Sequence, residues 1–178
     1  MTAEELKSLA LECGFTLAND LHPSTLRFMP EVRQMCAANT CHAFDKTWSC
    51  PPACGSIEDW AERASHYSEG ILLQTVGDRE DSWDFESMMD VADANKKQFE
   101  AFIKAVNASG MDYLAFSAGS CTRCKPCTYP DAPCRFPDEM KPSMEAAGLF
   151  VSDVCTRNGT KYNYGDLKIA YTCCILFN

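Results

Sequence analysis

The arrangement of cysteines constrains this chain more than any other feature of its sequence. Twelve of its 178 residues are cysteine, and eight of the twelve fall in two short segments, residues 36–54 and 121–134. The N-terminus, MTAEELKSLALECGF, lacks the basic stretch followed by an apolar stretch that marks a secretory signal. We therefore expect a cytoplasmic protein, in which clustered cysteines bind metal or carry out redox chemistry more often than they form disulfides.

The second cysteine group has the more specific spacing. The segment CTRCKPCTYPDAPCR places three cysteines at three-residue intervals and a fourth seven residues later: Cys121, Cys124, Cys127 and Cys134. A cubane iron–sulfur cluster takes one thiolate at each iron corner, and a tight loop with a cysteine at every third residue can reach three corners. Zinc sites more often use two separate Cys-x-x-Cys pairs. The spacing favours a [4Fe–4S] cluster, with zinc as the alternative.

Three basic residues surround this second group. Arg123 and Lys125 lie between its cysteines, and Arg135 directly follows Cys134. A cluster with four thiolates carries a net charge of about −2 when oxidised, so nearby cations stabilise it and raise its reduction potential. We expect these three residues to contact the cofactor, Arg135 most directly. The alternative for Arg123 and Lys125 is an ordinary solvated loop position.

The first cysteine group is less regular but offers as many thiols. The segment CAANTCHAFDKTWSCPPACG contains Cys36, Cys41, Cys50 and Cys54. Four cysteines within 19 residues indicate one shared site. Cys54 just precedes an expected helix start at Ser56, where free N–H groups favour a thiolate. His42 is an alternative ligand. Together the two groups predict two [4Fe–4S] clusters.

Hydrophobic periodicity predicts a small α/β fold with a mostly parallel or mixed sheet and flanking helices. Helices are expected over residues 2–13, 56–70 and 85–106, with a short one at 142–147. Strands are expected over 70–76, 112–118 and 167–177, with 149–155 as a further candidate. The order strand, helix, strand from residue 70 to 118 indicates a β-α-β unit, whose strands are parallel.

One domain accommodates all these elements. We expect a single α/β iron–sulfur domain over residues 1–178, with cluster-binding loops at 36–54 and 121–137. The four remaining cysteines fall on predicted helices and strands, where we expect them to be buried apolar residues: Cys13, Cys155, Cys173 and Cys174.

Composition excludes several classes of partner. The formal charge of −9 lacks the basic balance that favours nucleic acid or an anionic membrane surface. No apolar run reaches the roughly 18 residues of a membrane-spanning helix. The chain also has no glycine-rich phosphate loop, nucleophile elbow or zinc-protease helix motif, so its sequence names no substrate.

Four segments of the chain resemble a known family, the cysteine-rich predicted metal-binding proteins, a domain of unknown function. These segments are VRQMCAANTC, TWSCPP, SAGSCTRCKPC and CRFPDEMKPSMEAAGLFV, between about Val32 and Val151. The resemblance implies that seven cysteines are metal ligands: Cys36, Cys41, Cys50, Cys121, Cys124, Cys127 and Cys134. Cys54 belongs less clearly to the family pattern. The resemblance implies metal binding but supplies no reaction.

Three functions remain open at this point. The leading expectation is electron transfer through two [4Fe–4S] clusters, with a larger redox enzyme as the protein partner. The second is an enzyme in which one iron is left open for a small substrate, which requires that Cys54 is not a ligand. The third is a zinc-stabilised interaction module without a redox role.

Overall fold

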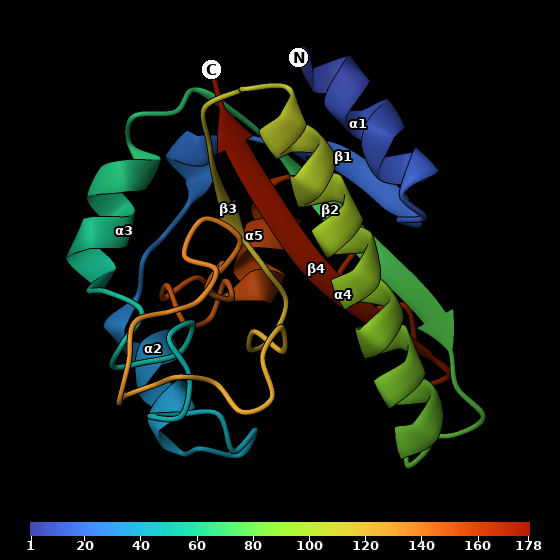
Figure 1. The fold of residues 1–178 in the computed structure, drawn as a ribbon. Coiled ribbons are helices and arrows are strands. Elements are labelled where there is room, and N and C mark those ends of the chain that lie inside the picture. Colours follow the sequence, from blue (N-terminus) through green and yellow to red (C-terminus); the bar gives the residue numbers. More distant parts are fainter.

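The computed structural model describes residues 1–178 and is built around one four-stranded sheet. Its strands are β1 (Leu17–Leu21), β2 (Glu69–Asp78), β3 (Tyr113–Phe116) and β4 (Lys168–Phe177). They lie in the order β1-β2-β4-β3, and every neighbouring pair is antiparallel (Figure 1). The predicted mixture of helices and strands is confirmed, but the prediction of a mostly parallel or mixed sheet is wrong.

The position of the C-terminal strand explains this difference. β2 and β3 run in the same direction, since both are antiparallel to β4, and α4 (Phe85–Ala108) connects them. However, β4 lies between them, so that Cys174 is paired with Leu72 on one side and Phe116 on the other. Residues 172–177 of β4 are all buried, and a central place in the sheet covers such a strand on both faces.

The two faces of the sheet bury two separate sets of apolar side chains. One set lies beneath α1 (Ala3–Glu12) and α4 and includes Leu6, Phe99, Phe102, Ile71, Leu73 and Cys173. The other set lies beneath α3 (Ile57–Ala64) and α5 (Val151–Arg157) and includes Trp60, Val154, Leu72 and Cys174. Consecutive residues of β2 and β4 thus alternate between the two faces, as the geometry of a strand requires. Figure 1 shows α1 and α4 together on one side of the sheet.

Local signals set the starts of the helices. A capping box starts α1: the Glu5 N–H donates to Thr2 Oγ1 at 3.3 Å, and the Thr2 N–H donates to Glu5 Oε2 at 2.8 Å. Ser56 and Asp59 form the same arrangement at the start of α3, as expected from Ser56. α3 ends at Ala64 and not near residue 70, because β2 already begins at Glu69.

Several other expectations for local structure are wrong. Most of the candidate strand at 149–155 is helical, because Val151, Val154 and Cys155 are buried with helical spacing in α5. Residues 142–147 form no helix: Ser143 makes an isolated parallel bridge with Ser117, and residues 144–148 are turns. The predictions also omit β1, the single 3₁₀ turn at Pro23–Thr25 and α2 (Pro30–Ala37), whose short segments carry little periodicity.

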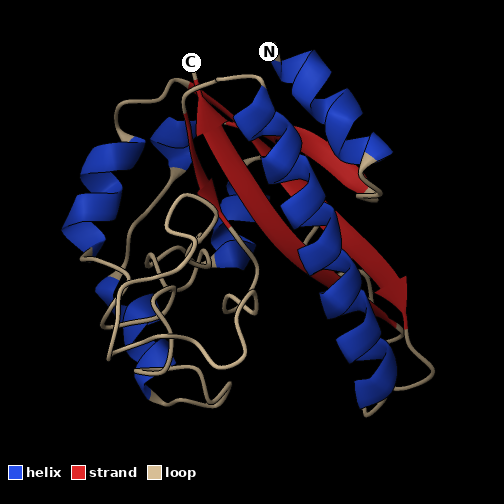
Figure 2. Cartoon of the chain, viewed as in Figure 1, coloured by secondary structure: helices blue, strands red, loops and turns tan.

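The cysteine-rich segments lie on the side of the sheet that carries α2 and α3, mostly as irregular loops (Figure 2). The second segment leaves the end of β3, where Ser117 closes a large loop. Its N–H donates to the Pro142 carbonyl at 2.8 Å, and its carbonyl accepts from the Met144 N–H at 3.1 Å. None of the helices combines the length and the apolar character needed to cross a membrane.

Leu176→Ala should destabilise the protein far more than Leu167→Ala. Leu176 lies in the central strand with no exposed surface, whereas Leu167 is 59% exposed. Emptying a buried leucine site costs about 2–5 kcal/mol of unfolding free energy, because the cavity only partly collapses. Urea unfolding of both variants measures the difference. Equal unfolding free energies would contradict the central position of β4.

Candidate metal centres

The second cysteine group surrounds one small cavity. All four of its thiols line a cavity of about 20 Å³: Cys121, Cys124, Cys127 and Cys134. The Phe136 N–H donates to the sulfur of Cys134 at 3.4 Å. Burial raises the pKa of Cys121, and the neighbouring thiols raise it further, whereas the Arg123 N–H opposes this change. The loop after β3 therefore brings the four predicted ligands to one place.

The first cysteine group lies around the end of α2 and the turns before α3. Cys36 is in the last turn of α2, so the loop begins after Ala37, two residues later than the predicted start at residue 36. Cys36, Cys41 and Cys50 line a second cavity of about 440 Å³. Burial, followed by the Glu145 carboxylate and the three other thiols of the group, raises the pKa of Cys36 to about 11. Cys54 is buried nearby but does not line this cavity.

Left-handed backbone conformations fold the first segment tightly. Asn39, His42 and Asp45 have φ values of 53°, 57° and 54°. Such angles are uncommon for residues other than glycine, and Asn, Asp and His adopt them more readily than most. Asn39 also accepts a hydrogen bond from the Phe44 N–H at 3.0 Å through its side chain. Strained backbone of this kind is concentrated at functional sites. His42 is exposed and makes no side-chain hydrogen bond.

Polar and aromatic contacts join the two cysteine segments. The Cys121 N–H donates to Ser49 Oγ at 2.9 Å, and this oxygen lies 3.9 Å from the sulfur of Cys50. Trp48 donates from Nε1 to the Ala132 carbonyl at 3.1 Å and packs edge-on against Tyr129, with ring centroids 5.0 Å apart. Ser49 has no exposed surface. The two groups of thiols therefore belong to one packed unit.

Within this unit, no three cysteine, histidine, aspartate or glutamate side chains converge closely enough to hold a single metal ion. The sequence matches the family described as "Predicted metal-binding protein (DUF2284)" over residues 19–177. The chain belongs to this family. No curated protein and no solved structure matches the sequence.

Membership of this predicted metal-binding family agrees with the state of the cysteines. All twelve cysteines are free, so none is used in a disulfide. Three of the four outside the two groups have no exposed surface and pack in the two cores, as predicted: Cys155, Cys173 and Cys174. Cys13 is partly buried against the core beneath α1 and α4.

The three cations predicted to contact a cofactor lie near the second group, but their side chains are engaged elsewhere or exposed. Arg123 forms an ion pair with Glu139 at 2.8 Å and stacks over Phe136. Arg135 donates to the Pro126 carbonyl at 3.2 Å, and Lys125 is exposed and forms no ion pair. None of the three side chains donates a hydrogen bond to a cysteine sulfur.

One cation that sequence reasoning missed does contact a thiol. Arg33 Nη2 donates to the sulfur of Cys54 at 3.6 Å. Arg33 lies on α2, one helical turn before Cys36. Recognition of α2 would have indicated this residue, because side chains three apart on a helix lie on the same face. The missed helix is thus the reason for the missed contact.

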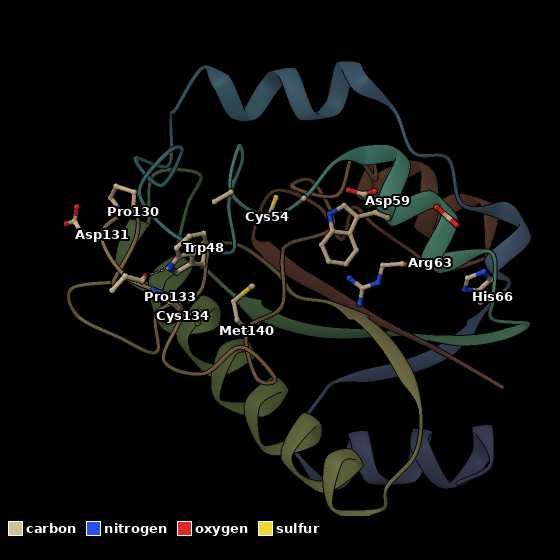
Figure 3. Close-up of a pocket in the computed structure, with 15 residues that line it drawn as sticks. Trp48, Cys54, Asp59, Arg63, His66, Pro130, Asp131, Pro133, Cys134 and Met140 are labelled. Carbon is tan, nitrogen blue, oxygen red and sulfur yellow. Dashed lines mark hydrogen bonds between the residues drawn. The ribbon is translucent and has the colours of Figure 1, made fainter.

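A third cavity reaches both cysteine groups. Figure 3 shows this cleft between α3 and the second cysteine loop, and its volume is about 930 Å³. Its wall includes Cys54 from the first group, Cys134 from the second, and the indole rings of Trp48 and Trp60. Arg63 lies 4.5 Å from the centre of the Trp60 ring. The cleft is therefore the surface from which both groups are approached together.

Cys127→Ala should remove the metal of the second group, whereas Cys173→Ala should leave the metal content unchanged. Cys127 is one of four thiols around a shared cavity. Cys173 lies inside the sheet, where its thiol donates to Asn95 Oδ1 at 3.3 Å, and its loss should cost about 1 kcal/mol of stability. Metal analysis and urea unfolding test both variants. Metal loss from Cys173→Ala would show that the ligands are assigned wrongly.

Proposed function

We propose that each cysteine group holds a [4Fe–4S] cluster and that the protein transfers electrons to or from a larger redox enzyme. The observation that carries this proposal is the contact of both groups with Ser49, which bonds the Cys121 N–H and lies 3.9 Å from the Cys50 sulfur. Ser49 thus contacts a cysteine of each group, which supports clusters that are neighbours within one packed unit. Electron tunnelling falls steeply with distance, so such neighbours exchange electrons rapidly.

The donor sets match this cofactor in number and in kind. Each group offers four thiols, which equals the number of irons in a [4Fe–4S] cluster. Soft thiolates select zinc or iron–sulfur clusters over hard cations such as magnesium. Donors to sulfur are already in place at Cys134, from the Phe136 N–H, and at Cys54, from Arg33. Hydrogen bonds of this kind orient and tune iron–sulfur clusters.

The cellular setting follows from the thiols and the charge. Twelve free cysteines suit a reducing compartment, which supports the cytoplasm. The partner should be a redox protein with a basic docking surface, because this chain carries a formal charge of −9. The same charge disfavours nucleic acid as a partner.

A catalytic first group is the second candidate function. The cavity of about 440 Å³ is lined by Cys36, Cys41 and Cys50 but not by Cys54. Its volume is within the range of small-molecule sites, and Glu145 and Tyr162 add polar groups to its wall. If Cys54 does not bind, one iron facing this cavity is left without a thiolate and can act as a Lewis acid.

Protein purified without oxygen should contain about eight irons and eight sulfides per chain, which is the content of two [4Fe–4S] clusters. When both clusters are reduced, their EPR signals should show mutual spin coupling, since Ser49 contacts both groups. Cys127→Ala should leave an uncoupled signal from the first cluster. Stoichiometric zinc with negligible iron would replace this proposal with the zinc-stabilised interaction module.

Cyanide binding distinguishes an electron-transfer protein with two closed clusters from an enzyme with an open iron. Added to the reduced protein, it should leave both EPR signals unchanged, because irons that each carry a thiolate have no free position. Cys54→Ala should convert the first cluster to one that responds. A shift that is already present in the unaltered protein, and is the same in Cys54→Ala, would establish the open iron instead.

A further inference from the structure

Trp60 carries the one buried polar side-chain atom of this chain that has no partner. Its indole Nε1 is shielded from solvent and makes no hydrogen bond, whereas every other buried side-chain nitrogen or oxygen makes one. The residue as a whole is only 8% exposed. A buried donor without an acceptor is unfavourable, and native proteins rarely retain one without a reason.

The unpartnered N–H lies against Gly55, the residue that follows Cys54. Cys54 and Trp60 also line the same cleft. The backbone of Gly55 packs against the nitrogen edge of the indole ring, since a Cβ at this position would lie 3.5 Å from Nε1. Gly55 has a φ of +94°, a conformation that suits glycine and turns the chain between Cys54 and α3. The donor is therefore held against the turn that Cys54 begins.

Cys54 already has a second donor. Arg33 Nη2 lies 3.6 Å from its sulfur, and no carboxylate forms an ion pair with Arg33. As a thiol, Cys54 itself donates toward the Ala146 carbonyl at 3.7 Å. A metal-bound thiolate has no proton to donate and can only accept, so Arg33 and Trp60 become its natural partners.

We propose that Arg33 and Trp60 donate hydrogen bonds to the sulfur of Cys54 as a cluster ligand, and thereby hold the first cluster at a higher reduction potential than the second. Such bonds raise the potential, because they stabilise the extra negative charge of the reduced form. The bond from Arg33 is charge-assisted and so is the stronger of the two. This inference rests on the proposed function.

Two features of the second group favour the same order of reduction potentials, whereas the charges of Lys125 and Arg135 oppose it, although neither side chain donates to a cysteine sulfur. Glu139 neutralises Arg123 there, and the sulfur of Cys134 accepts from a neutral backbone N–H. The Glu145 carboxylate lies near Cys36 and therefore lowers the reduction potential of the first cluster, against the proposed order. The positive charge of Arg33, which no carboxylate pairs, offsets this effect. One electron then passes from the reduced second cluster to the oxidised first cluster, and a low-potential one-electron donor reduces the second cluster again.

Redox titrations followed by EPR test the inference on the iron-loaded protein. Trp60→Phe removes the N–H but keeps a ring for Arg63 to stack on and for Phe116 to contact. Arg33→Gln removes the charge, and Arg33→Lys restores it. The matched controls are Trp83→Phe, at an indole that is 78% exposed, and Arg157→Gln, at a guanidinium paired with Asp153.

Arg33→Gln should reduce the ratio of reduced to oxidised first cluster about tenfold at a fixed potential, which corresponds to about 59 mV. Trp60→Phe should lower this potential by less, Arg33→Lys should recover part of the loss, and neither control should change it. The second cluster should keep its potential in all variants and should be the lower of the two. A first-cluster potential unchanged in both Trp60→Phe and Arg33→Gln, or a lower potential for the first cluster than for the second, would overturn the inference.

Iron content separates this result from a failure of the proposed function. Every variant is first analysed for iron and sulfide. About eight irons with unmoved potentials would refute only the roles of Arg33 and Trp60. Protein without iron would refute the clusters themselves, and with them this inference.

Discussion

Burial of β4 on both faces is the constraint on which the rest of the architecture depends. Its last six residues, 172–177, are inaccessible to solvent, so the strand needs apolar cover above and below and a neighbour on each side. β2 and β3 provide the neighbours, and the helices provide the cover. β3 is consequently an edge strand, and the loop that leaves its end is free to fold over the α3 side of the sheet. The site owes its position to this arrangement.

Polar contacts, and not apolar periodicity, organise the cysteine segments. The first segment turns through three left-handed residues, and the second is closed at Ser117. The two segments are joined by the hydrogen bond from the Cys121 N–H to Ser49, the hydrogen bond from Trp48 to the Ala132 carbonyl, and the contact of Trp48 with Tyr129. A net hydrogen bond contributes only about 1 kcal/mol. Metal binding supplies much larger free energies in small metal domains, so metal held by the proposed ligands would stabilise segments with so little core of their own.

The sequence predicts those parts of the molecule in which local chemistry decides. The capping box at Thr2, the start of α3 after Ser56 and the long amphipathic α4 all follow from nearby residues. The gathering of Cys121, Cys124, Cys127 and Cys134 around one cavity also follows from their short spacing. The family prediction is confirmed by the match over residues 19–177.

The remaining features depend on partners distant in the chain. Nothing in residues 70–118 indicates that a strand 50 residues later separates the two parallel members of the β-α-β unit. α5 was predicted as a strand because a seven-residue apolar segment does not distinguish the two periods. Arg33 was missed because its importance comes from Cys54, which lies beyond three intervening cysteines in the sequence.

The first cysteine group is asymmetric, and this asymmetry bears on what the protein can do. On one side, Cys36, Cys41 and Cys50 line a cavity large enough for a small molecule. On the other side, Cys54 is enclosed by Arg33, Ala146 and the turn at Gly55. Electron transfer through a closed first cluster requires Cys54 as a thiolate that accepts hydrogen bonds. Catalysis at an open iron requires Cys54 to remain a thiol that donates to the Ala146 carbonyl. If the unpartnered Trp60 N–H donates to Cys54 as proposed, it favours the thiolate, because an acceptor at Cys54 then removes the one unsatisfied buried donor in the chain.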